Sequence, residues 1–563
     1  MGKDIFCRYL KNEKRYIILL ICIIGMGVGI NGINPYIYGN IIDSITEIQR
    51  KEFEKWVIVF LVVLLLVQIL EAVESIIGNF LVNHIENKMQ ESLMKKILFL
   101  KCEEVDKYTE GKLLNRLEFD AEKIVGYYSD LLTSILMVAL NLSISLFFIL
   151  HISQKLSTIA LAVIPLLYFI NLVFREKIRK VSERTKRFED KYFGFISDVF
   201  FNLKSIKIFR EEKNIYEKYF GYLKKRLNLQ IKNTCLINII GMLRGMLGNV
   251  INIVILLIAG VAIISGQMTI GNMVAFNTYL GSFFESIFKV MELNLDRQSV
   301  LISYKRMLEL ENQEEEDYNA GIELGFIENI ICKNLNFGYE QEMILKELNI
   351  TISGNGLYSI VGNNGCGKTT FLKLLERFYD KVSGEIFINN IEIEKYALSS
   401  LRKSIFYMAK EPFFMQDTIL NNLRMGKDTV LKQEIIELCQ KVGIHDEIMY
   451  LPEGYETVME KGGENFSSGQ KQKLGFVRVL LSQASLILLD EVTSDMDGIA
   501  EKKMCDLVEE MSQYSIVINV SHKPESLKRS KKIFLIENGK IVGSGLHCEM
   551  LRGYEQYRKM FGV

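Results

Sequence analysis

The residues best suited to chemistry in this 563-residue chain lie in one glycine-rich segment, GNNGCGKTT. It runs from Gly362 to Thr370, after the strand-like GLYSIV and before the helical pattern FLKLLERF. In that setting the spacing G-x-x-x-x-G-K-[ST] is typical of a phosphate-binding loop, whose backbone N–H groups and helix N-terminus attract phosphate oxygens. We expect Lys368 to bridge the β- and γ-phosphates of ATP and the Thr369 hydroxyl to bind Mg²⁺.

A second strand-like run, SLILLD, ends in two carboxylates, Asp490 and Glu491. We expect Asp490 to hold Mg²⁺ through water and Glu491 to act as the general base toward attacking water. Carboxylates at strand ends are often merely solvated. A phosphate-binding loop in the same chain favours the catalytic interpretation here.

The phosphate-binding loop belongs to the second of two halves that are suited to different solvents. Residues 1–311 contain repeated apolar stretches near the length of about 20 residues that crosses a bilayer. We predict six membrane helices, at about 16–38, 57–80, 131–150, 156–174, 236–264 and 270–292. The connections 81–130 and 175–235 are rich in lysine and arginine and helical in their periodicity, which indicates that the membrane helices extend into the cytoplasm. Both termini are then cytoplasmic.

After residue 311 the pattern changes to that of a soluble domain. The acidic stretch 312–326 is predicted to be a linker, and residues 327–563 alternate short β-branched runs with helical patterns. Strands separated by helices indicate a mainly parallel α/β domain. The predicted fold class is therefore a membrane all-α six-helix domain followed by an α/β P-loop NTPase domain.

Composition argues against several other classes of protein. Lysine plus arginine and aspartate plus glutamate both total 68, so no basic surplus favours nucleic acid as a partner. The nine cysteines lack CxxC or zinc-ligand spacing, which argues against a disulfide framework or a structural metal. The basic N-terminal flank precedes a long apolar run from Tyr16, which fits a first membrane helix better than a cleaved signal peptide.

A longer segment around the second strand, NFSSGQKQKLGFVRVLLSQASLILLDEVTSDMD, carries a family resemblance. It is similar to the signature helix, Walker B strand and D-loop of an ATP-binding cassette (ABC) transporter. Six membrane helices fused ahead of such a cassette resemble an exporter half-transporter, so the resemblance covers essentially the whole chain. Segments near 111–124 and 202–213 resemble its coupling helices. The resemblance implies ATP and Mg²⁺ as cofactors, ATP hydrolysis coupled to export across a bacterial plasma (inner) membrane, and lipid around the membrane helices.

The resemblance also assigns roles to residues. Tyr339 matches the aromatic residue that stacks on adenine, and His522 matches the histidine that contacts the γ-phosphate and joins Glu491 in catalysis. The nucleotide-binding residues of the Walker A loop are Gly362, Asn363, Asn364, Gly365, Cys366, Gly367, Lys368, Thr369 and Thr370. Those of the signature are Ser467, Gly469 and Gln470, and Asp497 lies in the D-loop. The signature contacts ATP held by the opposite cassette, so a head-to-tail dimer is implied.

Three positions depart from the family pattern. Lys410 follows the strand-like run SIFYMA, at the position where the family usually has a glutamine that contacts Mg²⁺. A cation beside Mg²⁺ is electrostatically unfavourable unless its side chain reaches a phosphate instead. We therefore expect Lys410 to bind the nucleotide through its phosphates. Phe466 and Ser468 replace a leucine and a glycine of the signature. In the family, an altered signature can accompany pairing of two different chains, so a homodimer and a heterodimer are equally open. Cys366 replaces a common serine, and its thiol is either a reactive thiolate near Lys368 or an inert small residue.

The expected function is export of a peptide, a lipid or an amphipathic small molecule. The alternative is a regulatory or sensor subunit, or the weaker half of a heterodimeric exporter, with ATP binding and little turnover alone. Lys410 and the altered signature favour the alternative, whereas Glu491 and His522 favour an active ATPase. Polar residues inside membrane spans are costly and are therefore candidates for a substrate cavity. They are Glu71, Glu74, Asn141, Arg244 and Glu285.

Overall fold

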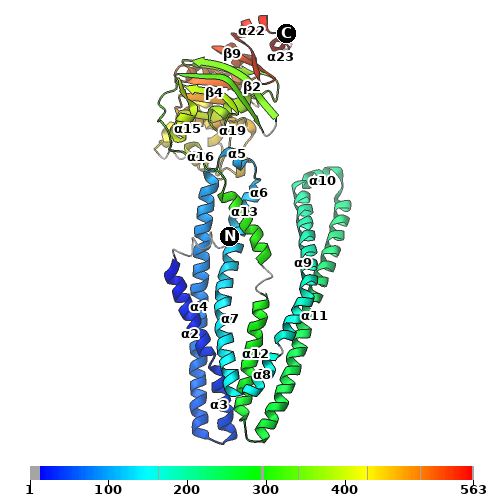
Figure 1. Ribbon diagram of the computed structural model, residues 1–563. Coiled ribbons are helices and arrows are strands. Elements are labelled where there is room, and N and C mark those ends of the chain that lie inside the picture. The colour runs from blue at the N-terminus through cyan, green and yellow to red at the C-terminus, as the bar shows by residue number, and fades with distance from the viewer. Residues whose placement is uncertain are drawn as a thin grey trace. The chain divides into compact units, whose positions relative to one another are not determined.

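The computed structural model describes residues 13–162, 164–292, 297–339, 342–425, 427, 429–494, 496 and 498–560 (Figure 1). The chain divides into two compact units. The first comprises residues up to 94 together with 114–310, and the second comprises residues 95–113 together with 311–563. A short segment from the middle of the helical half therefore belongs structurally to the second unit.

The helical half is built from long helices joined by short turns. Its helices are α2 (Lys14–Asn31), α3 (Asn34–Thr46), α4 (Arg50–Leu98), α5 (Cys102–Val105), α6 (Glu110–Asn115), a π-helix (Arg116–Asp120), α7 (Ala121–Ile152), α8 (Gln154–Ala162), α9 (Ile164–Phe201), α10 (Leu203–Phe209), α11 (Glu212–Ile264), α12 (Ile270–Glu292) and α13 (Arg297–Glu311). Within the first unit, α7, α8, α11 and α12 share an apolar core that includes Ile149, Ala160, Ile255 and Phe276.

The lengths of two helices agree with the prediction that the membrane helices continue beyond the lipid. Helix α4 has 49 residues and α11 has 53. At about 1.5 Å per residue each is more than twice as long as the roughly 30 Å hydrocarbon layer. By length and composition, four helical stretches of the described residues could cross a membrane: 14–46, 50–98, 110–152 and 212–264. Helices α8 and α9, in the predicted span 156–174, and α12, in the predicted span 270–292, fall outside that set, so the count of six stays a prediction.

The first predicted span, 16–38, is not one helix. Helix α2 ends at Asn31 and α3 begins at Asn34, because Pro35 at the start of α3 has no N–H for the preceding turn. The carbonyl of Gly32 in the break accepts a hydrogen bond from the Tyr279 hydroxyl at 2.7 Å. A side chain at Gly32 would lie 2.7 Å from Ile144. The break is thus held by neighbouring helices within the first unit.

The second unit contains two sheets. The strands are β1 (Asn329–Tyr339), β2 (Glu342–Ser353), β3 (Gly356–Val361), β4 (Ser383–Ile388), β5 (Ile391–Glu392), β6 (Ile405–Met408), β7 (Leu486–Asp490), β8 (Ile516–Val520), β9 (Lys532–Glu537) and β10 (Lys540–Gly545). The helices are α14 (Lys368–Leu375), α15 (Leu398–Ser404), α16 (Ile419–Arg424), α17 (Lys432–Val442), α18 (His445–Met449), α19 (Ser468–Ser482), α20 (Gly498–Ser512), α21 (Pro524–Lys528), α22 (His547–Gly553) and α23 (Glu555–Met560).

The larger sheet has the order β10-β9-β3-β8-β7-β6, and only β10 runs antiparallel to its neighbour. Strand β4, in the run GEIFIN, belongs instead to the smaller antiparallel sheet β2-β1-β4-β5. The mainly parallel arrangement predicted for the α/β domain is therefore that of the larger sheet. Its strands β7 and β8 are buried along their whole length, as parallel strands covered on both faces are.

The acidic stretch predicted as a linker is bound to the second unit. Arg402 of α15 makes two hydrogen bonds with the Glu316 carboxylate, at 2.6 and 2.8 Å. The Ile322 backbone N–H donates to the Lys395 carbonyl at 2.8 Å, and the same residue accepts from Ala397 at 2.9 Å. These contacts fix the stretch along the edge of the domain.

A second attachment to this domain comes from residues 101–106. The Tyr379 hydroxyl donates to Asp106 at 2.6 Å, and the backbone N–H of Asp380 donates to Glu103 at 2.9 Å. The segment of the helical half that contacts the domain here thus precedes the predicted coupling helix at 111–124. The other predicted segment, 202–213, contains α10 and belongs to the first unit.

Glu376, which follows α14, gives the stability of the second unit a specific dependence on pH. It is 6% exposed, and burial raises the pKa of its carboxyl from 4.5 to about 7. Between these values the folded chain keeps a proton that the unfolded chain has released. The stabilisation from this proton is complete below about pH 4.5 and is lost as the pH rises to 7. Glu376→Gln should therefore stabilise the protein at pH 8 by up to about 3 kcal/mol, and much less at pH 5.

Thermal unfolding of the detergent-solubilised chain at both pH values measures this difference. Glu385→Gln, which neutralises an exposed carboxylate on β4, serves as the matched control and should give no pH-dependent gain. An equal gain from both variants would show that net charge, and not burial of Glu376, is responsible.

Candidate functional site

The phosphate-binding loop leaves the end of β3, a central strand of the larger sheet. Gly367, with φ of 103°, adopts the left-handed conformation that favours glycine, and a Cβ there would lie 2.5 Å from Leu345. A Cβ at Gly362 would collide with the Ile536 carbonyl oxygen. The Lys368 ammonium is buried and donates to the carbonyls of Gly362 and Asn363, at 2.7 and 3.1 Å. The loop is therefore closed around its own lysine at the start of α14.

The first carboxylate after β7 meets this loop directly. The Thr369 hydroxyl donates to Asp490 Oδ2 at 2.7 Å, and the Tyr407 hydroxyl donates to the same oxygen at 3.1 Å. Asp490 is buried, and hydrogen bonds to a charged group contribute about 1.5–3 kcal/mol each. Two predicted magnesium ligands thus lie side by side, together with a tyrosine that was not predicted. Tyr407 on β6 carries no motif, so only strand pairing reveals it.

The second carboxylate, that of Glu491, lies between a lysine and a histidine side chain. Glu491 Oε2 is 3.4 Å from Lys410 Nζ, and Glu491 Oε1 is 4.0 Å from His522 Nε2. Glu491 itself has φ of 52°, a left-handed conformation that costs a non-glycine residue about 1–2 kcal/mol. Burial and the nearby Lys368 lower the pKa of His522, which favours its neutral form. Lys410 therefore pairs with the predicted general base.

Cys366 lies within the loop, but its surroundings do not favour a thiolate. The residue is 8% exposed, and burial raises the pKa of its thiol more than Lys368 lowers it. The prediction of a reactive thiolate therefore lacks support, and the thiol packs as a small side chain in the core beneath the loop.

The signature residues contact other parts of the same domain, and two of them are exposed at its surface. Ser467 caps α19 by accepting from the Gln470 backbone N–H at 3.2 Å, and the Gln470 side chain accepts from the Ser467 N–H at 2.9 Å. Gln470 also donates to Glu447 at 2.9 Å. Ser467 and Ser468 are exposed at the beginning of the helix, where Gly469 follows.

Tyr339 lies at the end of β1, 39% exposed, with its ring edge-on to Phe337 and Tyr379 at 5.0 and 5.3 Å. An exposed aromatic face at that position is free for a flat ligand to stack on. Of the other predicted site residues, Asp497 lies outside the described residues.

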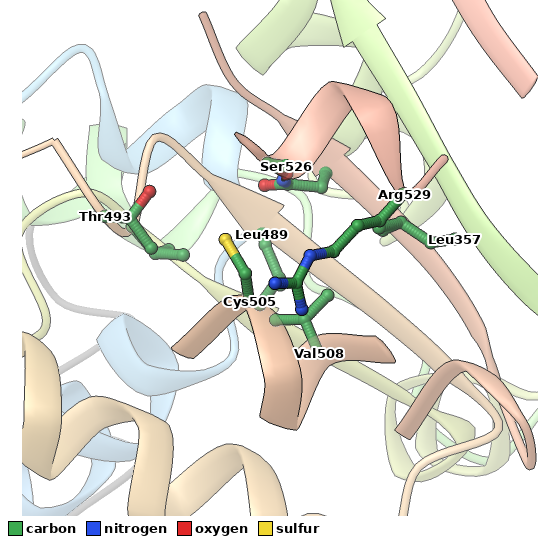
Figure 2. A pocket seen from close by; sticks show the side chains of 9 residues that line it. Leu357, Leu489, Thr493, Cys505, Val508, Ser526 and Arg529 are labelled. Carbon is green, nitrogen blue, oxygen red and sulfur yellow. The ribbon is translucent and has the colours of Figure 1, made fainter. Parts of the chain in front are cut away.

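A small cavity has a volume of about 10 Å³, and Figure 2 shows the side chains that line it. Leu489 of β7 and Asn519 of β8 line it, together with Cys505 of α20 and Arg529. Arg529 makes ion pairs with Asp506, Glu509 and Glu525. The volume has room for about one water molecule, so this cavity cannot hold a nucleotide.

Comparison with known families covers both halves of the chain. The family model of the ABC transporter transmembrane region matches residues 16–287, and the model described as ABC transporter matches residues 345–494. The chain belongs to the ABC transporter family. The match confirms the predicted family and the predicted fold class, with the membrane region and the ATPase domain fused in one chain. This half-transporter therefore binds ATP, and its ATPase activity is coupled to transport.

Similar proteins align with 80% or more of this ABC transporter chain. An ATP-dependent lipid A-core flippase from Syntrophus aciditrophicus is 26% identical over 569 residues, covering 99% of this chain and 94% of the relative. The putative multidrug export protein YgaD of Bacillus subtilis is 26% identical over 465 residues, covering 80% of this chain and 79% of the relative. A solved bacterial Atm1-family ABC exporter with ATP bound has a TM-score of 0.83 at 20% identity and covers 98% of both chains, which shows the shared fold.

The pairing of Lys410 with Glu491 predicts that this lysine slows ATP hydrolysis. Both side chains are partly exposed, so the ion pair is worth about 1 kcal/mol or less. Replacing Lys410 by glutamine removes this ion pair, so no lysine cation competes for the carboxylate oxygen that is predicted to accept the proton of the attacking water. We expect Lys410→Gln to raise the ATPase kcat about two- to fivefold.

The measurement compares kcat and KM for ATP of the purified transporter in lipid nanodiscs. Lys403→Gln, on an exposed position of α15, is the matched control. A fall of kcat in Lys410→Gln would mean that the lysine assists hydrolysis and does not restrain it.

Proposed function

We propose that this chain exports a lipid or another amphipathic molecule across a bacterial plasma membrane, powered by ATP hydrolysis at the site formed by Lys368, Thr369, Asp490, Glu491 and His522. The observation that carries the proposal is the direct hydrogen bond between Thr369 and Asp490. It joins the phosphate-binding loop to the strand that also supplies Glu491. A phosphate group seated in the loop is therefore next to the carboxylate that would activate water.

The residues present fit a magnesium ion. Thr369 and Asp490 offer a hydroxyl and a carboxylate oxygen 2.7 Å apart, and hard oxygen ligands are those that Mg²⁺ prefers. Among the described residues there is no group of three or more metal-ligating side chains. This agrees with an ion held by one or two protein ligands together with substrate phosphates. The bound ion would neutralise charge on the phosphates.

The other residues of the site bind, orient or accept protons. The Lys368 ammonium and the N-terminus of α14 would attract the β- and γ-phosphates, with the backbone N–H groups of the loop around them. Glu491 would accept a proton from the attacking water, and neutral His522 would donate a hydrogen bond to the γ-phosphate. Tyr339 would stack on the adenine ring, next to Phe337 and Tyr379.

The signature completes this site from a second chain. Ser467, Gly469 and Gln470 begin α19 on an exposed surface, and a helix N-terminus that faces outward suits the γ-phosphate of ATP held by a partner. ABC half-transporters generally dimerise, and we infer a head-to-tail dimer for this chain. Whether the partner is a second copy or a different half-transporter is decided by the activity of the chain alone.

The names of the relatives bear on substrate and location. The flippase and multidrug exporter named above come from bacteria, which supports a bacterial plasma membrane with both termini and the cassette cytoplasmic. Their names also favour a lipid or amphipathic drug over a peptide. We place the membrane domain at residues 1–311, with six membrane helices, the linker at 312–326 and the cassette at 327–563.

Glu491→Gln tests the proposed catalytic role. The amide keeps the shape of the side chain but cannot accept the water proton, so we expect ATP hydrolysis to fall about 10²- to 10⁴-fold while ATP still binds. The measurement is phosphate release by the purified full-length chain in lipid nanodiscs, beside binding of a fluorescent ATP analogue.

The matched control is Glu411→Gln, an exposed glutamate next to Lys410. Activity of the wild-type chain that Glu491→Gln abolishes would establish a self-sufficient homodimer. An inactive wild-type chain that still binds ATP would instead indicate a heterodimeric or regulatory subunit. Undiminished hydrolysis in Glu491→Gln would refute the proposed mechanism.

A further inference from the structure

The helical unit contains a cavity of about 370 Å³, lined by both polar and apolar residues, at the break between α2 and α3. Helices α4, α7 and α12 complete it. The lining residues are Asn31, Gly32, Asn34, Pro35, Tyr38, Phe60, Asn141, Ile144, Ser145, Thr278, Tyr279 and Ser282. The volume lies within the range of about 300–1,000 Å³ that is usual for small-molecule sites.

Several polar groups in this cavity lack a protein partner. Serines in membrane helices usually donate to the carbonyl one turn earlier, as Ser143 does to Ala139 at 2.8 Å. Within the described part of the chain, Asn141, Ser145 and Ser282 make no side-chain hydrogen bond, although all three line the cavity. The side-chain oxygen of Asn34 is buried without a partner. Unpaired polar groups are costly inside a membrane, so these groups require water or a polar ligand.

The charge of the lining restricts the class of ligand. Its polar side chains are carboxamides and hydroxyls, which both donate and accept hydrogen bonds, and none of its described residues is ionisable at neutral pH. A phosphate or an ammonium group would be buried there without a counter-charge. Of the charged or polar residues predicted to face a substrate, only Asn141 lines this cavity, whereas Glu71, Glu74 and Glu285 do not. The side chain of Arg244 lies outside the described residues.

The depth of the cavity agrees with a substrate site in the membrane. Asn141 and Ser145 lie twelve and eight residues before Ser153, where α7 ends. At about 1.5 Å per residue they are roughly 18 and 12 Å from that end of the helix. In the topology predicted above, the turn at Ser153 faces the outside, which places the cavity between the outer surface and the middle of the bilayer.

We propose that this cavity binds the uncharged, hydroxyl- or amide-bearing part of the molecule that the transporter exports. The proposal rests on the proposed function and adds the chemistry of the substrate's polar group. A glycosyl head group and a peptide amide share this chemistry, since both donate and accept hydrogen bonds without net charge. Phe60 and Ile144 supply an apolar wall beside the polar groups, as an amphipathic ligand needs.

The chain contains a convenient reporter for binding. Its one tryptophan, Trp56, is on α4 one helical turn before Phe60, which lines the cavity. We would titrate the full-length Glu491→Gln protein in nanodiscs with four probes that share an octyl chain, all below the concentration at which they form micelles. The probes are an octyl glucoside, an N-acetylglycine octylamide, octyl phosphate and octylammonium. Trp56 fluorescence then reports binding without any need for ATP turnover.

We expect saturable binding of the glucoside or the amide, at least tenfold tighter than binding of either charged probe. The stronger of these two neutral probes identifies a glycosyl group or a peptide amide as the source. Asn141→Leu, of similar size, should weaken that binding about three- to tenfold, and Ser282→Ala should weaken it less. Ser143→Ala, on the same helix but with its hydroxyl bonded to Ala139, is the matched control and should change nothing. Asn141→Asp should improve binding of octylammonium.

Equal binding of all four probes, or unchanged binding in both Asn141→Leu and Ser282→Ala, would overturn the proposal. These results are separate from those that test the proposed function, because the titration uses a hydrolysis-deficient protein. A chain that hydrolyses ATP but shows no selective probe binding contradicts only the cavity proposal. A chain that binds neutral probes selectively but never hydrolyses ATP supports the cavity and contradicts only the proposed function.

Discussion

The parallel register of β3, β8 and β7 is the constraint on which the ATP site depends. Ile360 pairs with Val520, and Val520 pairs with Asp490, so the loop after β3, the carboxylates after β7 and His522 after β8 start at the same level of the sheet. A slip of one residue would move one of these groups by about 3.3 Å, which exceeds the tolerance of a hydrogen bond. The hydrogen bond from Thr369 to Asp490 depends on this register and joins the two motifs.

The pairing of strands at the same edge of the sheet explains why Lys410 lies beside Glu491. Strand β6 pairs with β7, so the residue that follows β6 reaches the carboxylate that follows β7. A glutamine at this position could hydrogen-bond to Glu491 without changing the charge, whereas lysine places a cation 3.4 Å from it. Tyr407, on the same strand, approaches Asp490 from the same side. Strand β6 therefore determines the electrostatic surroundings of both carboxylates, although it carries none of the family's sequence motifs.

In the helical unit, polar groups gather around the break between α2 and α3. Proline and glycine interrupt the first span, and the Tyr279 hydroxyl satisfies one carbonyl of the break. The side chains of Asn141, Ser145 and Ser282 and the side-chain oxygen of Asn34 line the cavity without a hydrogen-bond partner among the described residues. Polar groups without hydrogen-bond partners are energetically unfavourable inside a membrane. Their presence on three separate helices around one cavity therefore indicates that the cavity binds a polar ligand or water. The membrane domain and the ATPase domain thus each contain one locus where polar groups from distant parts of the chain meet.

The sequence alone determined the family and the division into a helical membrane half and an α/β half. It also supplied the candidate residues of the ATP site, because phosphate binding requires a particular loop at a particular place between strand and helix. It also indicated that the helices of the membrane half are longer than their apolar stretches, since periodicity continues beyond those stretches. Sequence could not show that Lys410 pairs with Glu491, that Tyr407 reaches Asp490, or that residues 101–106 bind the cassette. These contacts join positions far apart in the chain, and only strand pairing and packing bring them together. Burial, likewise a property of the tertiary structure, raised the pKa of the Cys366 thiol against the expectation from its charged neighbour.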